Sequence, residues 1–319
     1  MAILWDGKRY HTLNYYLREK FGEKVFKISL DAGFTCPNRD GRVSTGGCVF
    51  CSARGSGDFT GTSKNLIEQF YEVKKMMNKK WKSGKYIAYF QAYTNTYADV
   101  GTLREKYYSI LELEDVVGIA IATRPDCLPE DVLELLEEIN SKTYLWVELG
   151  LQTVHDKTSK LINRSYDLDV YINSAKELRK RNIEVVTHVI LGLPGENREE
   201  MLQTVDFVAN SGTQGIKLHL LHLLKNTRLV DMHARGEFRL MELDDYVEII
   251  ADCIERIPQE MVIHRITGDG PRDTLVGPLW SLKKFEVINA IDHLLMDRDT
   301  WQGKKFTRDE SIERLFHRI

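Results

Sequence analysis

The stretch VVGIAIATRPDCLPEDVLELLEEINSKTYLWVELGL, residues 116–151, contains two short apolar runs separated by a longer amphipathic segment. The apolar runs, Val116–Thr123 and Tyr144–Leu151, have the length of buried strands, and Glu130–Ile139 between them carries apolar residues at helical spacing. Each strand together with its helix takes roughly 30 residues, the size of a β–α–β crossover, which joins two parallel strands. The stretch therefore predicts a parallel sheet with helices packed against it.

The same alternation extends on both sides of this stretch. Four more strands are predicted at Val25–Leu30, Tyr86–Tyr93, Ile183–Leu191 and Gly215–Leu221. Four more helices are predicted at Leu66–Lys80, Thr102–Leu113, Val170–Arg181 and Arg198–Asn210. Right-handed crossovers between these units give an α/β fold, a partial (β/α)6 barrel similar to a TIM barrel.

The pattern loosens after Leu221. A helix is predicted at Leu243–Glu255, a short strand at Val262–Ile266 and a helix at Leu282–Met296. We therefore expect residues 1–230 to form the barrel with an N-terminal helix, and residues 231–319 to form a C-terminal α/β extension packed on it.

The composition is that of a globular protein, because 43% of the 319 residues are hydrophobic and 29% are charged. No apolar run approaches the roughly 20 residues that span a bilayer. Asp6, Lys8 and Arg9 interrupt the region where a secretory signal would be apolar, so we expect a cytoplasmic protein without a membrane partner. A net charge of −3 argues against a strongly basic protein that coats DNA, although it is compatible with local basic faces.

Unusual polar and glycine residues follow several of the predicted strands. They occur at Tyr93–Thr96, Thr123–Asp126, Gln152 and Gly192–Glu196. Functional residues of parallel α/β folds lie at the carboxyl ends of the strands, so these segments are expected to surround the active site.

Three cysteines lie in one segment with the spacing C-x11-C-x2-C, at Cys36, Cys48 and Cys51. Thiolates favour zinc or iron–sulfur clusters. Three ligands leave one iron of a cubane open for a substrate, whereas a structural zinc ion needs a fourth ligand. No histidine lies between His11 and His155 to supply it. A redox pair would leave Cys36 without a role, so the cysteines alone leave cluster, zinc site and redox pair open.

The other two cysteines, Cys127 and Cys253, stand alone in apolar surroundings. Isolated cysteines of this kind are usually packed core thiols. They are also too few for a second cluster held by four cysteines, so we expect one cluster only.

The cysteine loop and several later motifs resemble the radical S-adenosylmethionine (SAM) superfamily. The commonest spacing there is C-x3-C-x2-C, and the longer first spacing resembles the branch that contains the catalytic subunit of Elongator. Within that branch, the whole chain is similar to the bacterial YtqA/YhcC family. The matching stretches are Ser29–Cys36, Gly47–Phe59, Phe90–Ala98, Ala122–Leu128, Glu148–Thr153 and His188–Glu196.

This resemblance implies one [4Fe–4S] cluster on Cys36, Cys48 and Cys51 and a bound SAM. It implies that Phe50 lies against the adenine and that the loop after the second strand binds the SAM amino group. It also implies that Gln152 and Arg164 contact SAM, that His188 contacts the ribose, and that the glycine turn Gly192–Glu196 borders the adenine. The full set of cofactor-binding candidates is Phe50, Tyr93, Thr94, Asn95, Glu148, Gln152, Arg164, His188, Gly192 and Gly195.

Each candidate also has a purely structural interpretation. Arg164 is of a type that is mostly exposed, and Gln152 suits the cap of a helix. The segment Gly192–Gly195 suits an ordinary strand-to-helix turn. His188, like His219 and His222, is of a kind that often belongs to a hydrogen-bonded core.

The resemblance further implies that tRNA is a partner, modified at a wobble uridine, and that flavodoxin or ferredoxin supplies electrons. The barrel takes up most of the chain, so the acetyl-transferase domain of the Elongator subunit has no counterpart here. The family therefore suggests conversion of 5-carboxymethylaminomethyluridine to 5-aminomethyluridine. Two other functions remain open, an oxidoreductase acting on a small molecule or tetrapyrrole, and a zinc-stabilised RNA-binding protein.

Several basic clusters are candidates for phosphate contacts with RNA, and two tryptophans near the later clusters are candidates for stacking on a base. They are Lys74–Lys75, Lys79–Lys80, Lys82, Lys85, Arg179–Arg181, Lys283–Lys284 and Lys304–Lys305, with Trp280 and Trp301.

Overall fold

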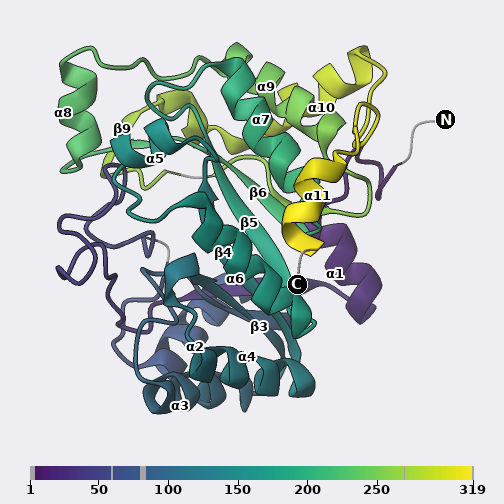
Figure 1. Cartoon of the computed structure of the whole chain (residues 1–319). Helices are drawn as coiled ribbons and strands as arrows, with labels where there is room; N and C mark the ends of the chain where they lie inside the picture. Colours follow the sequence, from purple (N-terminus) through teal and green to yellow (C-terminus); the bar gives the residue numbers. More distant parts are fainter. Residues whose placement is uncertain (1–3, 59, 80–83, 269, 318–319) are drawn as a thin grey trace.

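The computed structural model describes residues 4–58, 60–79, 84–268 and 270–317, and it is built around one parallel sheet. The sheet has seven strands in the order β1-β2-β3-β4-β5-β6-β8, and every neighbouring pair is parallel. It curls into a half-barrel (Figure 1). The strands are β1 (Val25–Leu30), β2 (Lys85–Phe90), β3 (Val116–Thr123), β4 (Tyr144–Gln152), β5 (Glu184–Leu191), β6 (Gly215–Leu220) and β8 (Val262–Arg265).

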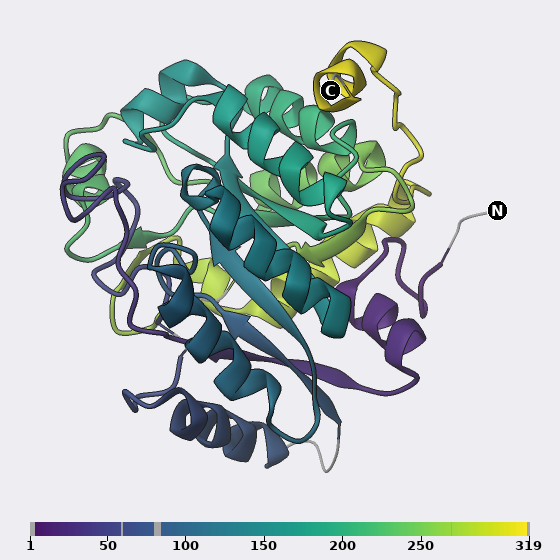
Figure 2. The same ribbon diagram turned by 60° about the horizontal axis from the view of Figure 1, so that its bottom comes forward.

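Helices cover the convex face of the sheet (Figure 2). The apolar faces of the helices and the outward side chains of the strands form one large buried core. The helices on this side are α2 (Leu66–Asn78), α3 (Val100–Leu111), α4 (Glu130–Lys142), α6 (Leu168–Lys180), α7 (Arg198–Ala209), α9 (Leu243–Arg256), α10 (Lys284–Asp297) and α11 (Glu310–His317).

Polar caps set the beginnings of several helices. Asn65 accepts hydrogen bonds from the first turn of α2, and Asp99 does the same for α3. Asn197 and Glu200 form a reciprocal capping box at the start of α7, which fixes where the chain leaves β5.

The concave face of the half-barrel is layered, as in TIM barrels. Its lowest layer, at the amino ends of the strands, is apolar, and helix α1 (Leu13–Phe21) covers it. Leu17 of α1 packs there with Val25, Ile87 and Trp146. The layers above are polar and lead to the carboxyl ends of the strands.

The structure confirms the predicted α/β half-barrel and adds a seventh strand to it. The short strand predicted in the C-terminal extension is β8, and it pairs with β6 in the main sheet. The extension therefore completes the barrel wall as well as packing on it. The proposed division at residue 230 stays a prediction.

Some shorter elements carry too weak a sequence pattern to be predicted. They are α5 (Asp156–Leu161), α8 (Arg228–Ala234), and the small antiparallel pair of β7 (Leu223–Leu224) and β9 (Leu275–Gly277). Lys80, the last residue of one predicted helix, lies outside the described residues. Among the helices of the described residues, none has the length and apolar character needed to span a membrane.

Candidate active site

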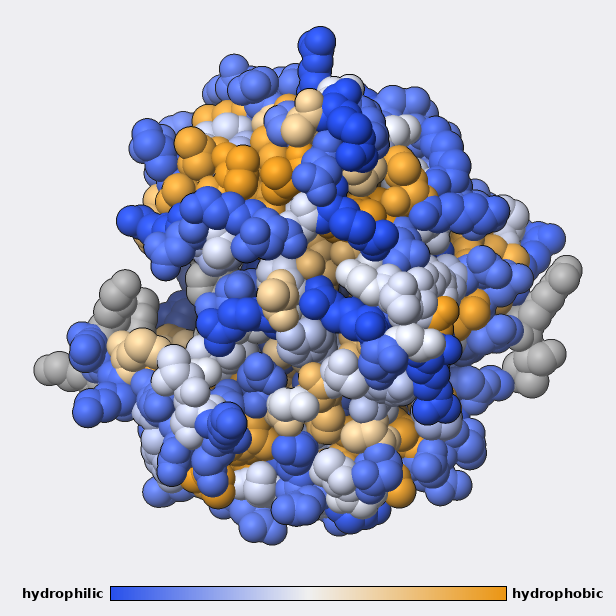
Figure 3. All heavy atoms as spheres, turned by 90° about the vertical axis from the view of Figure 1, so that its left-hand side faces the viewer, coloured by the Kyte–Doolittle hydropathy of each residue, from blue (hydrophilic) through white to orange (hydrophobic). Residues whose placement is uncertain are grey.

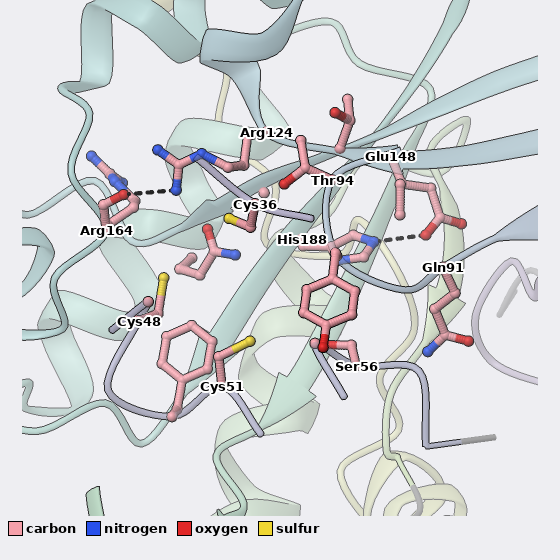
Figure 4. Close-up of a pocket in the computed structure, with 18 of the residues that line it drawn as sticks. Cys36, Cys48, Cys51, Ser56, Gln91, Thr94, Arg124, Glu148, Arg164 and His188 are labelled. Atoms are coloured by element: carbon pink, nitrogen blue, oxygen red, sulfur yellow. Dashed lines mark hydrogen bonds and ion pairs between the residues drawn. The ribbon is translucent and has the colours of Figure 1, made fainter. Parts of the chain in front are cut away.

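The loop between β1 and α2 carries three cysteines over the carboxyl ends of the strands. Cys36, Cys48 and Cys51 line one cavity of about 170 Å³, and their sulfur atoms face it (Figure 4). The backbone N–H of Cys51 donates to the carbonyl oxygen of Cys48 at 3.1 Å, so the last two cysteines sit on one tight turn. Gly46 and Gly47 precede this turn with φ of 79° and 73°, a backbone conformation that favours glycine.

Polar contacts fix the cysteine loop to the rest of the barrel. The side chain of Asn38 donates to the carbonyl oxygen of Asn163 at 2.7 Å, and the side chain of Asn163 donates back to Gly47 O at 2.9 Å. Arg39 Nη2 donates to the carbonyl oxygen of Cys51 at 2.9 Å. The three thiols are therefore held in place by backbone and side-chain contacts.

The chemistry of this pocket suits an iron–sulfur cluster. Burial raises the pKa of Cys48 to about 12, and the neighbouring Arg124 acts in the opposite direction. Thiolates are the ligand form, and three arginines that line the same cavity add positive charge near them: Arg39, Arg124, which also pairs with Asp126, and Arg164. Within the described residues, no three His, Cys, Asp or Glu side chains are grouped closely enough to hold one metal ion. A cubane is compatible with this wider arrangement, because each thiolate binds a different iron.

Seven of the ten cofactor-binding candidates line this cavity with the cysteines. They are Phe50, Tyr93, Thr94, Glu148, Gln152, Arg164 and His188. The Thr94 hydroxyl is buried and has no hydrogen-bond partner within the described residues, which leaves it available to a ligand. Gln152 is held at the cavity by a left-handed backbone conformation, with φ of 65°.

The other three candidates, Asn95, Gly192 and Gly195, do not line this cavity. Asn95 is fully buried, and its side-chain amide donates to the carbonyl oxygens of Phe90 at 3.1 Å and Ala122 at 2.8 Å. These bonds tie together the ends of β2 and β3. The two glycines have φ of 87° and 80°, which suits the turn from β5 to α7.

Arg164 borders the cavity, but its guanidinium contacts the backbone. It is only 1% exposed, and it donates to the carbonyl oxygens of Leu151, Thr153 and Tyr166 at 2.6 to 3.1 Å. The alternative interpretation of Arg164 as an exposed residue is therefore wrong. Arg164 shapes the turn after β4 in this structure, and its contact with SAM stays a prediction.

A buried carboxylate lies below the cysteines, in the middle layer of the half-barrel. Glu148 is fully buried and accepts four hydrogen bonds. Trp146 donates to Oε1 at 2.9 Å. The hydroxyl of Tyr89 donates to Oε2 at 2.7 Å, His188 Nε2 does so at 2.8 Å, and Lys217 donates to the same oxygen. The contact between His188 and Glu148 is visible in Figure 4.

The charges of this layer shift the pKa values of its members. Burial would raise the pKa of Glu148, but Lys217 and Lys27 hold it well below its usual range. Burial, together with Lys217, lowers the pKa of His188 to about 4. His188 is therefore neutral at pH 7, and its hydrogen bond to a carboxylate places the proton on Nε2.

His188 should make the stability of the protein depend on pH. Its ordinary pKa is 6.5, so between pH 6.5 and about 4 the unfolded chain binds a proton that the folded chain does not. Stability then falls as the pH drops through this range, by about 2 kcal/mol at pH 5. The His188→Gln variant lacks this contribution, so its Tm should fall less than the wild-type Tm between pH 7 and pH 5 in anaerobic calorimetry. The exposed His293→Gln is the control and should keep the wild-type slope. An identical slope in His188→Gln would contradict the assignment.

The sequence pointed to Arg124 through the segment Thr123–Asp126, but it did not single out Lys217 or Arg265. Arg124 donates to the carbonyl oxygen of Arg164 at 3.0 Å and lies over the ring of Tyr166 at 4.8 Å. Lys217 and Arg265 stand inside short apolar strands. For Lys217 and Arg265, the available signal was a charged side chain within an otherwise apolar run.

The fold and the site together define a class of protein. The chain belongs to the radical SAM superfamily, whose family model matches residues 38–208, and a model of the Radical_SAM C-terminal domain matches residues 213–297. The chain is 58% identical to YtqA of Bacillus subtilis (strain 168) over 304 residues, which are 95% of this chain and 94% of YtqA. It is 39% identical to YhcC of Escherichia coli (strain K12) over 293 residues, 92% of this chain and 94% of YhcC. The predicted relation to the YtqA/YhcC family is thereby confirmed.

More distant similarities extend to the Elongator branch. The chain is 25% identical to a tRNA uridine(34) acetyltransferase of Methanocaldococcus infernus over 167 residues, 50% of this chain and 30% of that protein. The solved structure of M. infernus Elp3, lacking its N-terminus, matches 76% of this chain and 63% of its own with a TM-score of 0.63 at 17% identity. That likeness supports the half-barrel fold.

Membership of the superfamily makes the protein an enzyme that uses a [4Fe–4S] cluster and SAM. The predictions of cluster and SAM are confirmed at this level. A structural zinc site and a simple redox pair are therefore no longer needed to explain the three clustered cysteines.

Proposed function

We propose that Cys36, Cys48 and Cys51 hold the [4Fe–4S] cluster and that the cavity beside them binds SAM. The support is that the three sulfur atoms and seven of the cofactor-binding candidates line the same cavity. The unpaired hydroxyl of Thr94 and the side chain of Gln152 are placed to hydrogen-bond the polar parts of SAM. The half-buried ring of Phe50 offers an apolar surface for the adenine.

When bound, the cluster supplies the electron that cleaves SAM into methionine and a 5′-deoxyadenosyl radical. The residues of the half-barrel position the reacting groups and exclude water from them. The apolar layer under α1 closes the lower end of the barrel. The hydrogen bonds of Glu148 hold His188, Tyr89 and Lys217 in fixed positions under the cavity.

We further propose that the substrate is a tRNA wobble uridine and that the enzyme converts 5-carboxymethylaminomethyluridine to 5-aminomethyluridine. SAM would take one hydrogen and two electrons from the carbon between the nitrogen and the carboxylate, and water would then release the two-carbon group as glyoxylate. The supporting observation is the similarity to a relative whose name specifies tRNA uridine 34. Flavodoxin or ferredoxin is the electron donor that we expect.

The reaction is tested with reconstituted holoenzyme, SAM, a reductant and tRNA that carries the carboxymethylated uridine. Mass spectrometry of the digested tRNA should show 5-aminomethyluridine appearing together with 5′-deoxyadenosine. SAM cleavage that leaves the modified uridine unchanged would contradict this substrate.

The basic clusters predicted from the sequence are largely paired with acidic residues. Lys74 contacts Asp115 at 3.2 Å, and Lys283 contacts Glu286 at 3.1 Å. Further pairs are Lys85–Glu23, Arg181–Glu130 and Lys305–Glu255. Lys80 and Lys82 lie outside the described residues. The two tryptophans pack inside the protein's own structure, since Trp280 donates to Met241 O and Trp301 lies under Lys304.

The face that carries the cysteine loop is a better candidate for RNA. Figure 3 shows this side of the molecule, where hydrophilic side chains run across the middle and apolar side chains gather above them. Arg42 and Arg54 are exposed on the cysteine loop, and neither has an ion pair within the described residues. Arg54 directly precedes Gly55 and Ser56, which line the cavity of the cysteines, and Arg42 lines a separate pocket with Pro37 and Tyr97.

Binding of tRNA should therefore depend on salt and on these arginines. The affinity should fall steeply as salt rises, and Arg42→Gln or Arg54→Gln should each reduce the slope of log Kd against log salt by about 1. Arg314→Gln, on the exposed side of α11, is the control and should leave the slope unchanged. Filter binding of the holoenzyme over a salt series measures this, and a flat salt response would speak against an RNA substrate.

A further inference from the structure

The middle layer of the half-barrel holds more positive than negative charge. Among the described residues that face this layer, Lys27, Lys217 and Arg265 are cations, and Glu148 is the one carboxylate. The nearby histidines add no further positive charge, because burial lowers their pKa values. Burial lowers the pKa of both lysines, and an anion bound beside them would favour their charged forms.

Glu148 is already committed to other partners. Its two oxygens accept from Trp146, Tyr89, His188 and Lys217, so its charge is paired with Lys217. No ion pair of Lys27 or Arg265 is found within the described residues. The ammonium of Lys27 lies 4.7 Å from the ring centre of Tyr89, and burial lowers its pKa.

Arg265 is open to the cavity of the cysteines. It is the last residue of β8 and is aligned with Lys217 on the neighbouring strand β6. Its side chain lines the same cavity as Cys36, Gln152 and His219. A Cβ atom at Gly268 would lie 3.3 Å from Arg265 Nη1, so the glycine leaves room for the guanidinium.

An unpaired cation in a buried site is costly, and an anionic ligand removes that cost when it binds. The planar guanidinium matches a carboxylate through two parallel hydrogen bonds. The uridine proposed as substrate ends in a carboxylate, and the proposed product lacks it. A site for this group would distinguish substrate from product.

We propose that Arg265, assisted by Lys27, binds the carboxylate of the modified uridine inside the half-barrel, an inference that rests on the proposed tRNA substrate. The uridine then enters from the cysteine face with its side chain pointing down towards the middle layer. The carbon next to this carboxylate then lies beside SAM, because Arg265 lines the cavity proposed to bind SAM. Arg265 is a binding residue in this arrangement.

The test compares two anticodon stem-loops that differ only in the wobble base, one with 5-carboxymethylaminomethyluridine and one with 5-aminomethyluridine. Their phosphates are identical, so a difference in Kd for the SAM-loaded holoenzyme reports the carboxylate. The wild-type enzyme should bind the carboxylated RNA about tenfold or more tightly than the other, the range of a charge-assisted hydrogen bond. Arg265→Gln should bind both equally, Arg265→Lys should keep part of the preference, and Arg314→Gln should keep all of it.

Iron content and SAM affinity are measured in the same variants. Both should remain at wild-type values in Arg265→Gln, which separates loss of the carboxylate site from loss of the cofactors. A wild-type enzyme without preference, or an undiminished preference in Arg265→Gln, would overturn the proposal. Turnover is scored separately, because a preference without conversion supports the carboxylate site and contradicts the proposed reaction.

Discussion

Cys48→Ala protein is expected to lose the [4Fe–4S] cluster and, with it, all reductive cleavage of SAM. Cys48 lies on the same tight turn as Cys51 and faces the same cavity as Cys36, so its removal leaves two thiolates for the cluster. Iron counting and EPR of the reduced protein, with and without SAM, measure the result. The wild-type signal should shift when SAM is added, and the variant should have no signal.

The matched control is Cys253→Ala, which removes a cysteine buried in α9 far along the chain from the loop. It should keep a full cluster and the SAM-dependent shift. Cys36→Ala and Cys51→Ala should behave like Cys48→Ala. A cluster that survives in Cys48→Ala, or stoichiometric zinc in the wild-type protein, would refute the assignment of these cysteines.

Glu148→Gln is expected to be the most destabilising single substitution in the half-barrel. It removes the carboxylate that balances Lys217 and accepts from His188 and Tyr89, and it leaves buried cations without an anion. Breaking a buried pair from one side typically costs about 3–5 kcal/mol. The free energy of unfolding, measured by anaerobic urea denaturation, should fall by an amount of this order.

Two further variants separate the charge effect from a packing effect. Glu148→Gln combined with Lys217→Met should recover much of the lost stability, because both members of the pair are then removed. Glu255→Gln is the control, since Glu255 is also buried but its partner Lys305 is largely exposed, and its cost should be smaller. Additive losses in the double variant would show that the pairing of Glu148 with Lys217 is not the source of the effect.

The alternation of apolar runs and amphipathic segments was enough to predict the first six strands and their parallel arrangement. Each strand of a parallel sheet is buried on both faces, so its sequence is apolar over the whole length. The pairing of β8 was harder to predict. Its four residues carry no periodicity, and its partner β6 lies before a long stretch of intervening chain.

The cysteine part of the site could be predicted, because the spacing of the three cysteines along the chain indicates a shared ligand. The three cysteines lie close in sequence, and the structure places them at one cavity. Lys217 and Arg265 were not predicted because their role depends on contacts across the sheet. Arg164 shows the same limit, since only the folded turn after β4 reveals that backbone carbonyls take up its guanidinium.

Strand β8 pairs with β6 and also contacts the segment just before α1. Ile263 of β8 donates its backbone N–H to the carbonyl oxygen of His11, just before α1, and the backbone N–H of His11 donates to the side-chain oxygen of Gln302. Helix α1, which covers the lower end of the half-barrel, is therefore synthesised early, whereas β8, the last strand of the sheet, is synthesised late. Because contacts so distant in sequence form late and slowly, the half-barrel is completed only after most of the chain has left the ribosome. A chain that stops before β8 would expose the unpaired edge of β6, an edge that invites aggregation.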